Sequence, residues 1–265
     1  MICFLVPVKS KQLSSDWHVF SKLVDRSLKS INGQIDRDFQ IIVACHELPE
    51  SKFEHPQVHY IQVDFKPPQL TNSDWEEDRR LKEGDKARKI LSAFEYANKN
   101  FEIDYFMVVD SDDCIHKGIS KYVNARIENN IPGWFINKGY FYIEGKRLAW
   151  KIRSNFNVRC GTCIIIKKDL FKHLIQEKPY LYYFHEKTEL NNGELLTPYP
   201  GAAAIYSMAN SENHFMSPSK MMDLVNQTKF FTIAHLESVY SKISRYRPRY
   251  IDNRFKRTFN FYHIS

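Results

Sequence analysis

The sequence predicts an α/β domain built on a mostly parallel sheet. Short apolar runs typical of buried strands alternate with stretches whose apolar residues recur at helical spacing. This repeated strand–helix–strand order favours parallel strands with helices on the faces of the sheet. Charged residues follow several apolar runs directly, where sheets of this kind bind ligands. With 265 residues, the chain is long enough to bury one such core.

The first half of the chain carries the clearest pattern. Four apolar runs predict buried strands: residues 2–8, 39–45, 58–64 and 103–109. A helix is expected over residues 16–31, ended by Asn32-Gly33. A second helix is expected to begin at Gly84-Asp85, with Asp85 as its N-cap.

The second half is less regular. We expect a strand over 159–167, a helix over 169–176, a strand over 202–208 and a helix over 217–226. No internal repeat and no clear linker interrupt the chain. The prediction is therefore one domain, residues 1–239, followed by a C-terminal extension, residues 240–265.

Positive charge is concentrated in that extension. The chain has a formal net charge of +7, and residues 240–265 hold seven basic residues against one Asp. Tyr and Phe are interleaved with these charges. The combination suits an anionic membrane surface, a nucleic acid, or a segment that docks its aromatic side chains on the domain. We favour a membrane surface and expect no nucleic acid partner.

The chain has five cysteines, an odd number, and no basic leader. We therefore expect free thiols in a cytoplasmic protein. Cys160 and Cys163 have CxxC spacing, but three Ile residues follow them, so we expect buried cysteines near a strand. No apolar run approaches the ~20 residues that span a bilayer. A peripheral position on the inner face of the membrane is compatible with the basic extension.

The segment Asp110-Ser111-Asp112-Asp113 follows the fourth apolar run directly. Three carboxylates in a tight turn at a buried strand end repel one another unless a cation compensates them. Oxygen-rich clusters of this kind suit Mn²⁺ or Mg²⁺, which commonly bridge carboxylates and phosphate oxygens. The segment predicts a metal site, and an exposed acidic turn is the alternative.

Other common catalytic motifs are missing. The chain has no phosphate-binding loop with its Gly-Lys-Ser/Thr end, no Gly-x-Gly-x-x-Gly and no Gly-x-Ser-x-Gly. The segment that begins with His185-Glu186 ends with Glu189 where a zinc protease has His. Kinase-type, dinucleotide-dependent, hydrolase and zinc-protease chemistry therefore lack their sequence signatures.

Three segments in this order resemble the GT-A-fold glycosyltransferases, most closely bacterial nucleotide-sugar transferases of the family 2 type. They are Phe4–Val8, Phe39–Ala44 and Val108–Asp113, in which Asp110-Ser111-Asp112 matches the Asp-x-Asp motif. The resemblance covers about residues 1–215. It implies a single Rossmann-like GT-A domain with a mostly parallel sheet flanked by helices. It also implies transfer of a sugar from a nucleoside-diphosphate donor.

The resemblance assigns roles to individual residues. Asp112 would bind Mn²⁺ or Mg²⁺, Asp110 would contact the metal or the donor's ribose, and His214 would complete the coordination. Donor contacts are also expected from residues at strand ends and from two lysines that share one helix face: Pro7, Val8, Glu47, Asp64, Lys86, Lys89, Ser111, Gly161 and Thr162. A solvated helix face is the alternative for the two lysines.

An inverting transfer needs a base that deprotonates the acceptor hydroxyl. Family 2 enzymes carry an acidic residue after the strand and helix that here span residues 159–176, so Glu186 is the nearest match. Glu189 and Asp223 are alternatives. Candidates for stacking on the acceptor are Trp134, Lys138 and Tyr140, unless the aromatic residues belong to the core.

The preferred function is a metal-dependent, inverting glycosyltransferase that acts on a glycan or lipid-linked acceptor in surface polysaccharide synthesis. A sugar-phosphate nucleotidyltransferase is the first alternative, although residues 7–11 lack the Gly-rich loop that such an enzyme carries after its first strand. A non-enzymatic protein that binds polyanions through the basic extension is the second.

Overall fold

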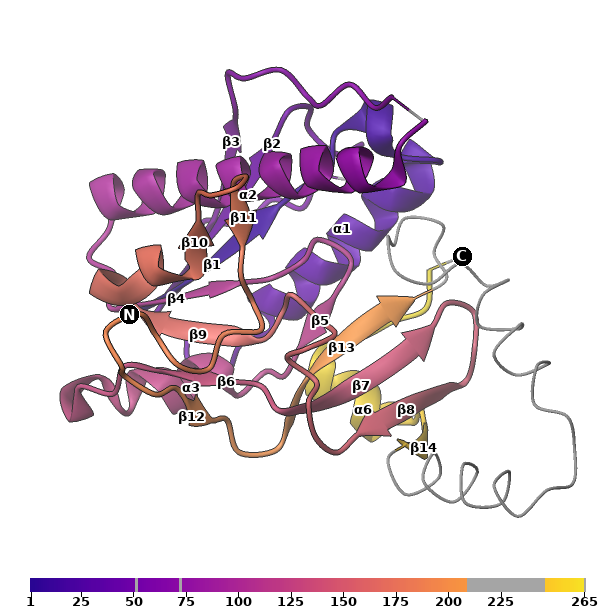
Figure 1. Cartoon of the computed structure of the whole chain (residues 1–265). Helices are drawn as coiled ribbons and strands as arrows, with labels where there is room; N and C mark the ends of the chain where they lie inside the picture. The colour runs from indigo at the N-terminus through magenta and orange to yellow at the C-terminus, as the bar shows by residue number, and fades with distance from the viewer. Residues whose placement is uncertain (51, 72, 209–245, 265) are drawn as a thin grey trace, which may run out of the picture.

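The structure is a computed structural model that describes residues 1–50, 52–71, 73–208 and 246–264 (Figure 1). It confirms the predicted α/β class. A largely parallel, seven-stranded sheet has the order β12-β6-β9-β4-β1-β2-β3, the helix-covered arrangement that the GT-A resemblance implied. Its strands are β1 (Ile2–Pro7), β2 (Phe39–Cys45), β3 (Val58–Gln62), β4 (Tyr105–Val108), β6 (Gly133–Phe135), β9 (Ile164–Lys167) and β12 (Thr197–Pro198).

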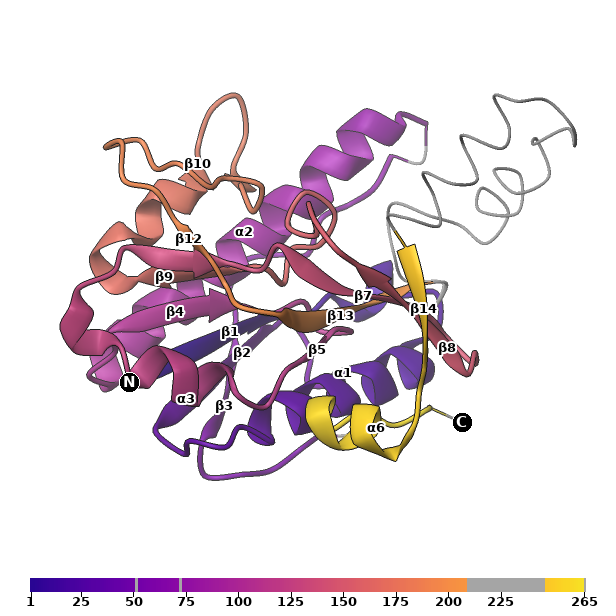
Figure 2. The ribbon, with the colours of Figure 1, turned by 90° about the horizontal axis from the view of Figure 1, so that it is seen from below.

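Two long helices cover opposite faces of this sheet (Figure 2). Helix α1 (Trp17–Asn32) begins at its cap Asp16, whose carboxylate accepts a hydrogen bond from the Val19 amide. Helix α2 (Trp75–Asn100) packs on β1 and β2. Its apolar face buries Ile90 and Phe94 in the main core. Smaller helical elements are η1 (Lys11–Leu13), α3 (Ile119–Asn124), η2 (Ile127–Asn129), η3 (Lys168–Leu174) and α6 (Asn253–Phe259).

Strand β1 pairs in parallel with β2 on one side and with β4 on the other. The chain therefore leaves β1 toward β2 and later crosses back to β4. This reversal opens a crevice at the carboxyl ends of β1 and β4. Ligands of open α/β sheets bind in such crevices. The segment after Pro7 and the segment after Val108 meet there.

A second, five-stranded sheet has the order β14-β8-β7-β13-β5, and the sequence patterns did not predict it. Its strands are β5 (Cys114–Ile115), β7 (Lys138–Ile143), β8 (Leu148–Ile152), β13 (Ala202–Met208) and β14 (Tyr246–Tyr250). All but the β7–β13 pair are antiparallel. The sheet joins segments from the acidic turn, the middle of the chain and the C-terminal segment. A small hairpin pairs β10 (Ile175–Gln176) with β11 (Tyr182–Tyr183).

Three predicted boundaries were wrong. Helix α2 begins at Trp75, capped by Asp74, and not at Gly84 with Asp85 as its cap. Residues 75–83 are almost all charged and show no apolar periodicity. The first turns of α2 are therefore stabilised by helix propensity and by the Asp74 cap. Residues 159–163 form a loop before β9. The helix expected over 169–176 is the 3₁₀ element η3.

The C-terminal segment packs on the domain. Strand β14 pairs with β8, and α6 buries Phe255 and Phe259 against Tyr140 and Tyr142 in a second apolar cluster. For the aromatic residues Phe255 and Phe259, the structure therefore agrees with one of the three alternatives given above, in which the extension docks its aromatic side chains on the domain. The proposed boundary at residue 239, the helix over 217–226 and Asp223 lie outside the described residues. Within the described part of the chain, no helix has the length and apolar character to cross a membrane.

Candidate functional site

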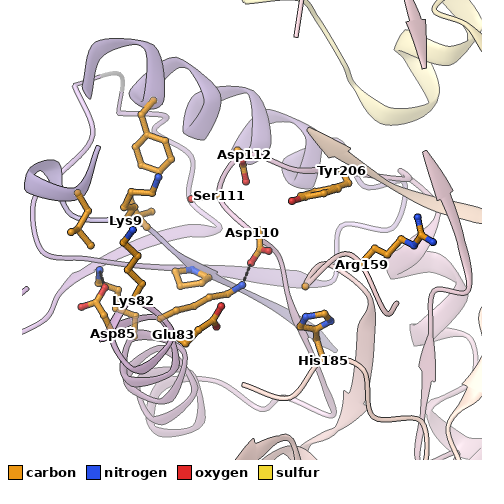
Figure 3. Close-up of a pocket in the computed structure, with 17 residues that line it drawn as sticks. Lys9, Lys82, Glu83, Asp85, Asp110, Ser111, Asp112, Arg159, His185 and Tyr206 are labelled. Atoms are coloured by element: carbon orange, nitrogen blue, oxygen red, sulfur yellow. Dashed lines mark hydrogen bonds and ion pairs between the residues drawn. The ribbon is translucent and has the colours of Figure 1, made fainter. Parts of the chain in front are cut away.

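A pocket occupies the crevice at the carboxyl ends of β1 and β4 (Figure 3). Its floor comes from the ends of these strands, one wall from α2, and the opposite wall from the loop before β9 and from β13. Eight of the predicted site residues line it: Pro7, Val8, Lys86, Lys89, Asp110, Ser111, Asp112 and Gly161.

Lysines of α2 face the acidic turn across this pocket. Lys86 Nζ lies 2.7 Å from Asp110 Oδ1. Burial lowers the pKa of Lys86, but the charges of Asp110 and Glu83 outweigh burial and hold that pKa above its usual range. The ammonium therefore stays charged beside the carboxylate. Lys82 lies one turn before Lys86 and also lines the pocket.

Gly161 lets this ion pair sit against the backbone. A Cβ at residue 161 would lie 2.7 Å from Asp110 Oδ2 and 3.0 Å from Lys86 Nζ. Both distances are shorter than a carbon atom tolerates without displacement of its neighbours. A side chain at this position would therefore push the pair apart or fill the pocket.

A second buried ion pair fixes the inner wall. Lys89 Nζ lies 2.6 Å from Asp85 Oδ2, and His46 Nε2 lies 2.7 Å from Asp85 Oδ1. Burial lowers the pKa of Lys89, although Asp85 raises it in part. The chain His46–Asp85–Lys89 links the loop after β2 to α2, so it holds the helix in place beside the pocket.

Asp113, the last carboxylate of the turn, points into the protein and not into the pocket. It is fully buried and accepts hydrogen bonds from Thr162 Oγ1 at 2.6 Å, the Ser207 amide at 3.1 Å and Cys160 Sγ at 3.2 Å. Burial, followed by the charges of Asp112 and Asp110, raises its pKa well above the usual value. Thr162 Oγ1 also accepts a hydrogen bond from the Asp110 amide. Asp113 and Thr162 therefore shape the turn from beneath.

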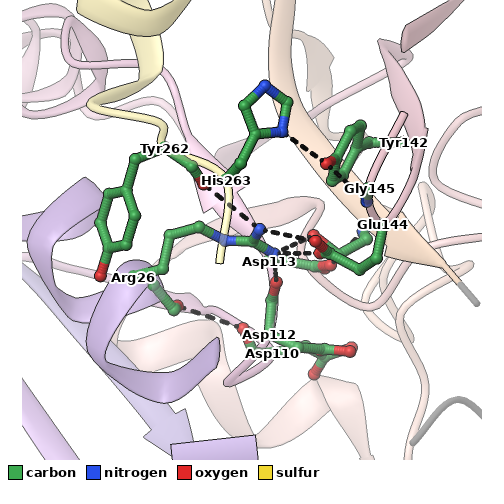
Figure 4. A network of polar contacts seen from close by, with 11 residues as sticks. Arg26, Asp110, Asp112, Asp113, Tyr142, Glu144, Gly145, Tyr262 and His263 are labelled. Carbon is green, nitrogen blue, oxygen red and sulfur yellow. Dashed lines mark hydrogen bonds and ion pairs between the residues drawn. The ribbon is translucent and has the colours of Figure 1, made fainter. Parts of the chain in front are cut away.

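Arg26 of α1 supports the turn from the other side (Figure 4). Its guanidinium is fully buried and bonds Glu144 at 2.5 and 3.1 Å, Ser207 Oγ at 3.0 Å and the Asp112 carbonyl at 3.4 Å. The ring of Phe261 lies 4.9 Å from the guanidinium carbon. Arg26 thus joins α1, the acidic turn, the β7–β8 turn and the C-terminal segment. A buried charge of this kind is costly once its partner is lost.

The far wall of the pocket is formed by Arg159, His185 and Tyr206. His185 Nδ1 lies 2.8 Å from the Asn157 carbonyl. Burial and the Lys86 charge lower the pKa of His185, so the ring is neutral near pH 7. Tyr206 contacts Phe141 edge to face, and the Arg159 guanidinium lies 6.0 Å from the Phe141 ring.

Several predicted residues lie elsewhere. Glu47 accepts a hydrogen bond from the Lys11 amide outside the pocket, and Asp64 is exposed in the loop after β3. Glu186 and Glu189 are exposed, and neither lines the pocket, although Glu186 adjoins His185. His214 lies outside the described residues.

The predicted acceptor residues do not gather at the pocket. Trp134 is buried in the core against Tyr105 and Tyr122. Tyr140 packs on α6, and Lys138 is exposed at the start of β7. The bulky aromatic residues of this region therefore serve mainly to pack the sheets together.

Partners within the protein already hold two carboxylates of the acidic turn. Asp110 faces the Lys86 ammonium, and Asp113 is bound by Thr162 and Ser207. No group of three or more His, Cys, Asp or Glu side chains in the described ranges is arranged to hold a metal ion. The described residues therefore offer no site with three such ligands, and Lys86 places a positive charge beside Asp110.

Sequence reasoning missed several residues of the pocket. Most were missed because an element begins elsewhere than predicted. Lys82, Glu83 and Asp85 lie on the early part of α2, and Arg159 lies in a loop that was expected to be a strand. The spacing of Lys82, Lys86 and Lys89 would have indicated one helix face, had the helix been extended toward Asp74. Tyr206 carried no local signal, and His185 stood out only as the start of an incomplete zinc-protease motif.

The chain matches no family model, and no curated protein sequence matches it. Among solved structures, a fragment of TarS from S. aureus is similar at a TM-score of 0.44 and 14% identity, over 88% of this chain and 67% of that one. The complex of this fragment with UDP-GlcNAc has a TM-score of 0.44 and 12% identity, over 92% and 71%. The inositol-1-phosphate CTP transferase from T. maritima has a TM-score of 0.43 and 12% identity, over 85% and 95%. Likenesses of this size do not by themselves assign a function.

Proposed function

We propose that this chain is a glycosyltransferase that uses a nucleoside-diphosphate sugar. One observation carries the proposal. The acidic turn after β4 and a row of lysines on α2 converge on a pocket at the switch point of a largely parallel sheet. The resemblance of the β1, β2 and β4 segments to family 2 glycosyltransferases supports a sugar donor at this corner of the sheet.

The pocket offers distinct groups for the parts of such a donor. Lys82 and Lys86 line the pocket, and their ammonium groups would neutralise a diphosphate, both in the bound donor and as it leaves. The Asp110 carboxylate can accept hydrogen bonds from ribose hydroxyls. The absence of a side chain at Gly161 lets the Asp110–Lys86 pair lie against the loop backbone.

The acceptor side is the wall with Arg159, His185 and Tyr206. We retain Glu186 as the base for an inverting transfer, with Glu189 as the alternative, because the loop that carries both also places His185 in the pocket. The acceptor is a glycan or a lipid-linked glycan of a surface polysaccharide. Attack by its hydroxyl on the anomeric carbon would break the bond to the diphosphate, while the base takes the hydroxyl proton.

The predicted Mn²⁺ or Mg²⁺ stays a prediction. If bound, the ion would supply Lewis-acid stabilisation of the leaving diphosphate. Asp110 and Asp112 are the described residues that would hold it, together with His214. Loss of turnover in EDTA and its recovery with Mn²⁺ would support a metal-dependent reaction. Full turnover in EDTA would show that the reaction needs no metal ion and that the lysines supply the positive charge of the site.

A nucleotidyltransferase is the second candidate, because a lysine-lined pocket beside carboxylates also suits a nucleoside triphosphate. The two functions give different products. Incubation with a nucleotide sugar would release a nucleoside diphosphate from a glycosyltransferase. Incubation with a sugar phosphate and a nucleoside triphosphate would release pyrophosphate from a nucleotidyltransferase.

The test is a thermal-shift panel of nucleoside diphosphates and nucleotide sugars, followed by turnover assays with the stabilising donor. A ligand that binds only the native state raises the unfolding temperature. Asp110→Asn and Asp112→Asn should each lower turnover at least a hundredfold. Asp169→Asn, at an exposed position on η3, is the matched control and should be unchanged. Wild-type rates in both pocket variants, or pyrophosphate as the product, would reject the proposal.

A further inference from the structure

The second sheet and the helix after it carry all of the molecule's net positive charge. Residues 138–153 and 246–257 together hold ten basic residues and two acidic ones. The whole chain has a net charge of +7, so the remainder is close to neutral. Both acidic residues already have partners, because Glu144 pairs with Arg26 and Asp252 with Arg249.

Seven of these ten basic residues lie on or next to β7, β8 and β14, and the other three lie on α6. Strand β14 is the outermost strand and pairs with β8 (Figure 2). In this antiparallel register, Arg247 lies directly opposite Lys151. Lys138 and Arg153 flank the pair, because Gly139 lies opposite Ile152 on the other side of β8. Like charges opposite each other destabilise a sheet, so such an arrangement gains stability from a bound anion.

Apolar and aromatic side chains alternate with these cations along β8 and β14. Tyr250 lies opposite Leu148, and Pro248 lies opposite Trp150. Because side chains alternate between faces along a strand, these four share the face away from Lys151 and Arg247. Leu148 is 40% exposed, Trp150 38% and Tyr250 55%. They are three of the large apolar side chains that the described residues leave exposed, and here they adjoin one another.

We propose that this region, the β8–β14 edge, docks on an anionic lipid surface. Trp and Tyr are favoured at the level of lipid headgroups, and a neighbouring Leu gains free energy when it enters the acyl boundary. Lys151 and Arg247 project from the opposite face of the same edge, and their long side chains can extend past the outer strand to lipid phosphates and add attraction to an anionic leaflet. A water-soluble polyanion would satisfy the cations but would leave Leu148 and Trp150 in water, whereas a lipid surface that meets the sheet at this edge would contact side chains of both faces.

The edge differs from the predicted basic extension. The aromatic residues Phe255, Phe259 and Phe261 are buried in the second cluster, so they do not face a membrane. Conversely, Leu148, Trp150 and Lys151 belong to β8, far from the extension in sequence. Deletion of the extension would remove β14 and part of the core, so substitutions on the surface give the informative test.

The test is sedimentation of the full chain with vesicles of phosphatidylcholine that contain about 30% phosphatidylglycerol, which supplies the anionic charge. Two double variants address the two faces: Trp150→Ala with Tyr250→Ala, and Lys151→Glu with Arg247→Glu. Each should weaken binding at least tenfold. Wild-type binding should fall at high salt and be weak on pure phosphatidylcholine.

Matched controls carry the same chemical changes elsewhere. Trp75→Ala replaces an exposed Trp at the start of α2, and Lys172→Glu with Lys178→Glu reverses two exposed charges near β10. Both should bind as the wild type does. Unfolding temperatures of all variants establish that the chains are folded.

Three outcomes would overturn the proposal: no binding of the wild type to anionic vesicles, binding that both double variants retain, or equal losses in the controls. Binding to the soluble anionic sugar tetragalacturonate but not to vesicles would assign the edge to an acidic glycan instead. The readout is binding alone, so it stands or fails independently of the proposed transferase activity.

Discussion

Gly161 shows how a single residue without a side chain can decide the geometry of the pocket. A Cβ at this residue would lie 2.7 Å from Asp110 Oδ2 and 3.0 Å from Lys86 Nζ. The pair in turn lies between the acidic turn and α2. The geometry of the pocket therefore depends on close approach of a loop backbone to two charged groups.

We predict that Gly161→Ala weakens binding of the stabilising nucleotide sugar at least tenfold, because the new methyl group displaces the ion pair. The fall should appear as a smaller thermal shift at equal ligand concentration. Gly84→Ala is the control, since a Cβ there has only an ordinary contact 3.7 Å from the Leu181 carbonyl and Ala favours a helix interior by about 1 kcal/mol. Equal donor binding by the two variants would contradict the role given to Gly161.

At the scale of elements, two histidines hold the C-terminal segment on the domain, and Arg26 links it to the acidic turn. His116 contacts the Phe259 ring edge to face, and His263 Nδ1 lies 2.9 Å from the Tyr142 hydroxyl. Burial is the main cause that lowers the pKa of both rings. The native state therefore favours the neutral imidazoles.

Acidification should loosen this segment. For a group whose pKa is lower in the folded state, stability is present above the unfolded value of about 6.5 and is lost as the pH falls through the folded value. We predict that amides of residues 246–264 exchange faster at pH 5.5 than at pH 7.5, after correction for intrinsic rates. His116→Asn combined with His263→Asn should reduce this difference, because Asn keeps an acceptor and does not titrate. A pH effect of the same size in the double variant would exclude the histidines as its source.

At the scale of the whole molecule, packing, hydrogen bonds and the Arg26–Glu144 ion pair hold the two sheets together without a disulfide. All five cysteines are buried free thiols, spread over both sheets and the pocket loop. Burial raises the pKa of Cys3, Cys160 and Cys163 well above the usual value, so these thiols are poor nucleophiles.

We predict that reducing agents leave the unfolding temperature unchanged and that a thiol reagent such as DTNB labels none of the five cysteines quickly in the native protein. After denaturation, all five should react. Rapid labelling of the native chain would show that the packing around Cys160 and Cys163 opens. A shift of the unfolding temperature under reduction would indicate a disulfide instead.

The local pattern of the sequence determined the strands of the parallel half, the first helix, the acidic turn at the end of β4 and the free state of the cysteines. The strands, the helix and the turn depend on short-range periodicity, on caps and on strand ends, all of which are visible in a few neighbouring residues. The free thiols were inferred from the odd number of cysteines. Asp110, Ser111 and Asp112 are therefore predictable as pocket residues from the sequence alone.

Only the tertiary structure decided which side chains share the pocket and which face the core. It placed Asp113 beneath the turn, Trp134 inside the core and Tyr206 at the pocket, because contacts between distant segments set these positions. The second sheet joins five strands from β5 to β14, so its pairing left no local pattern to detect. The same long-range pairing brought Lys151 beside Arg247 and divided the basic extension between a buried aromatic core and an exposed edge.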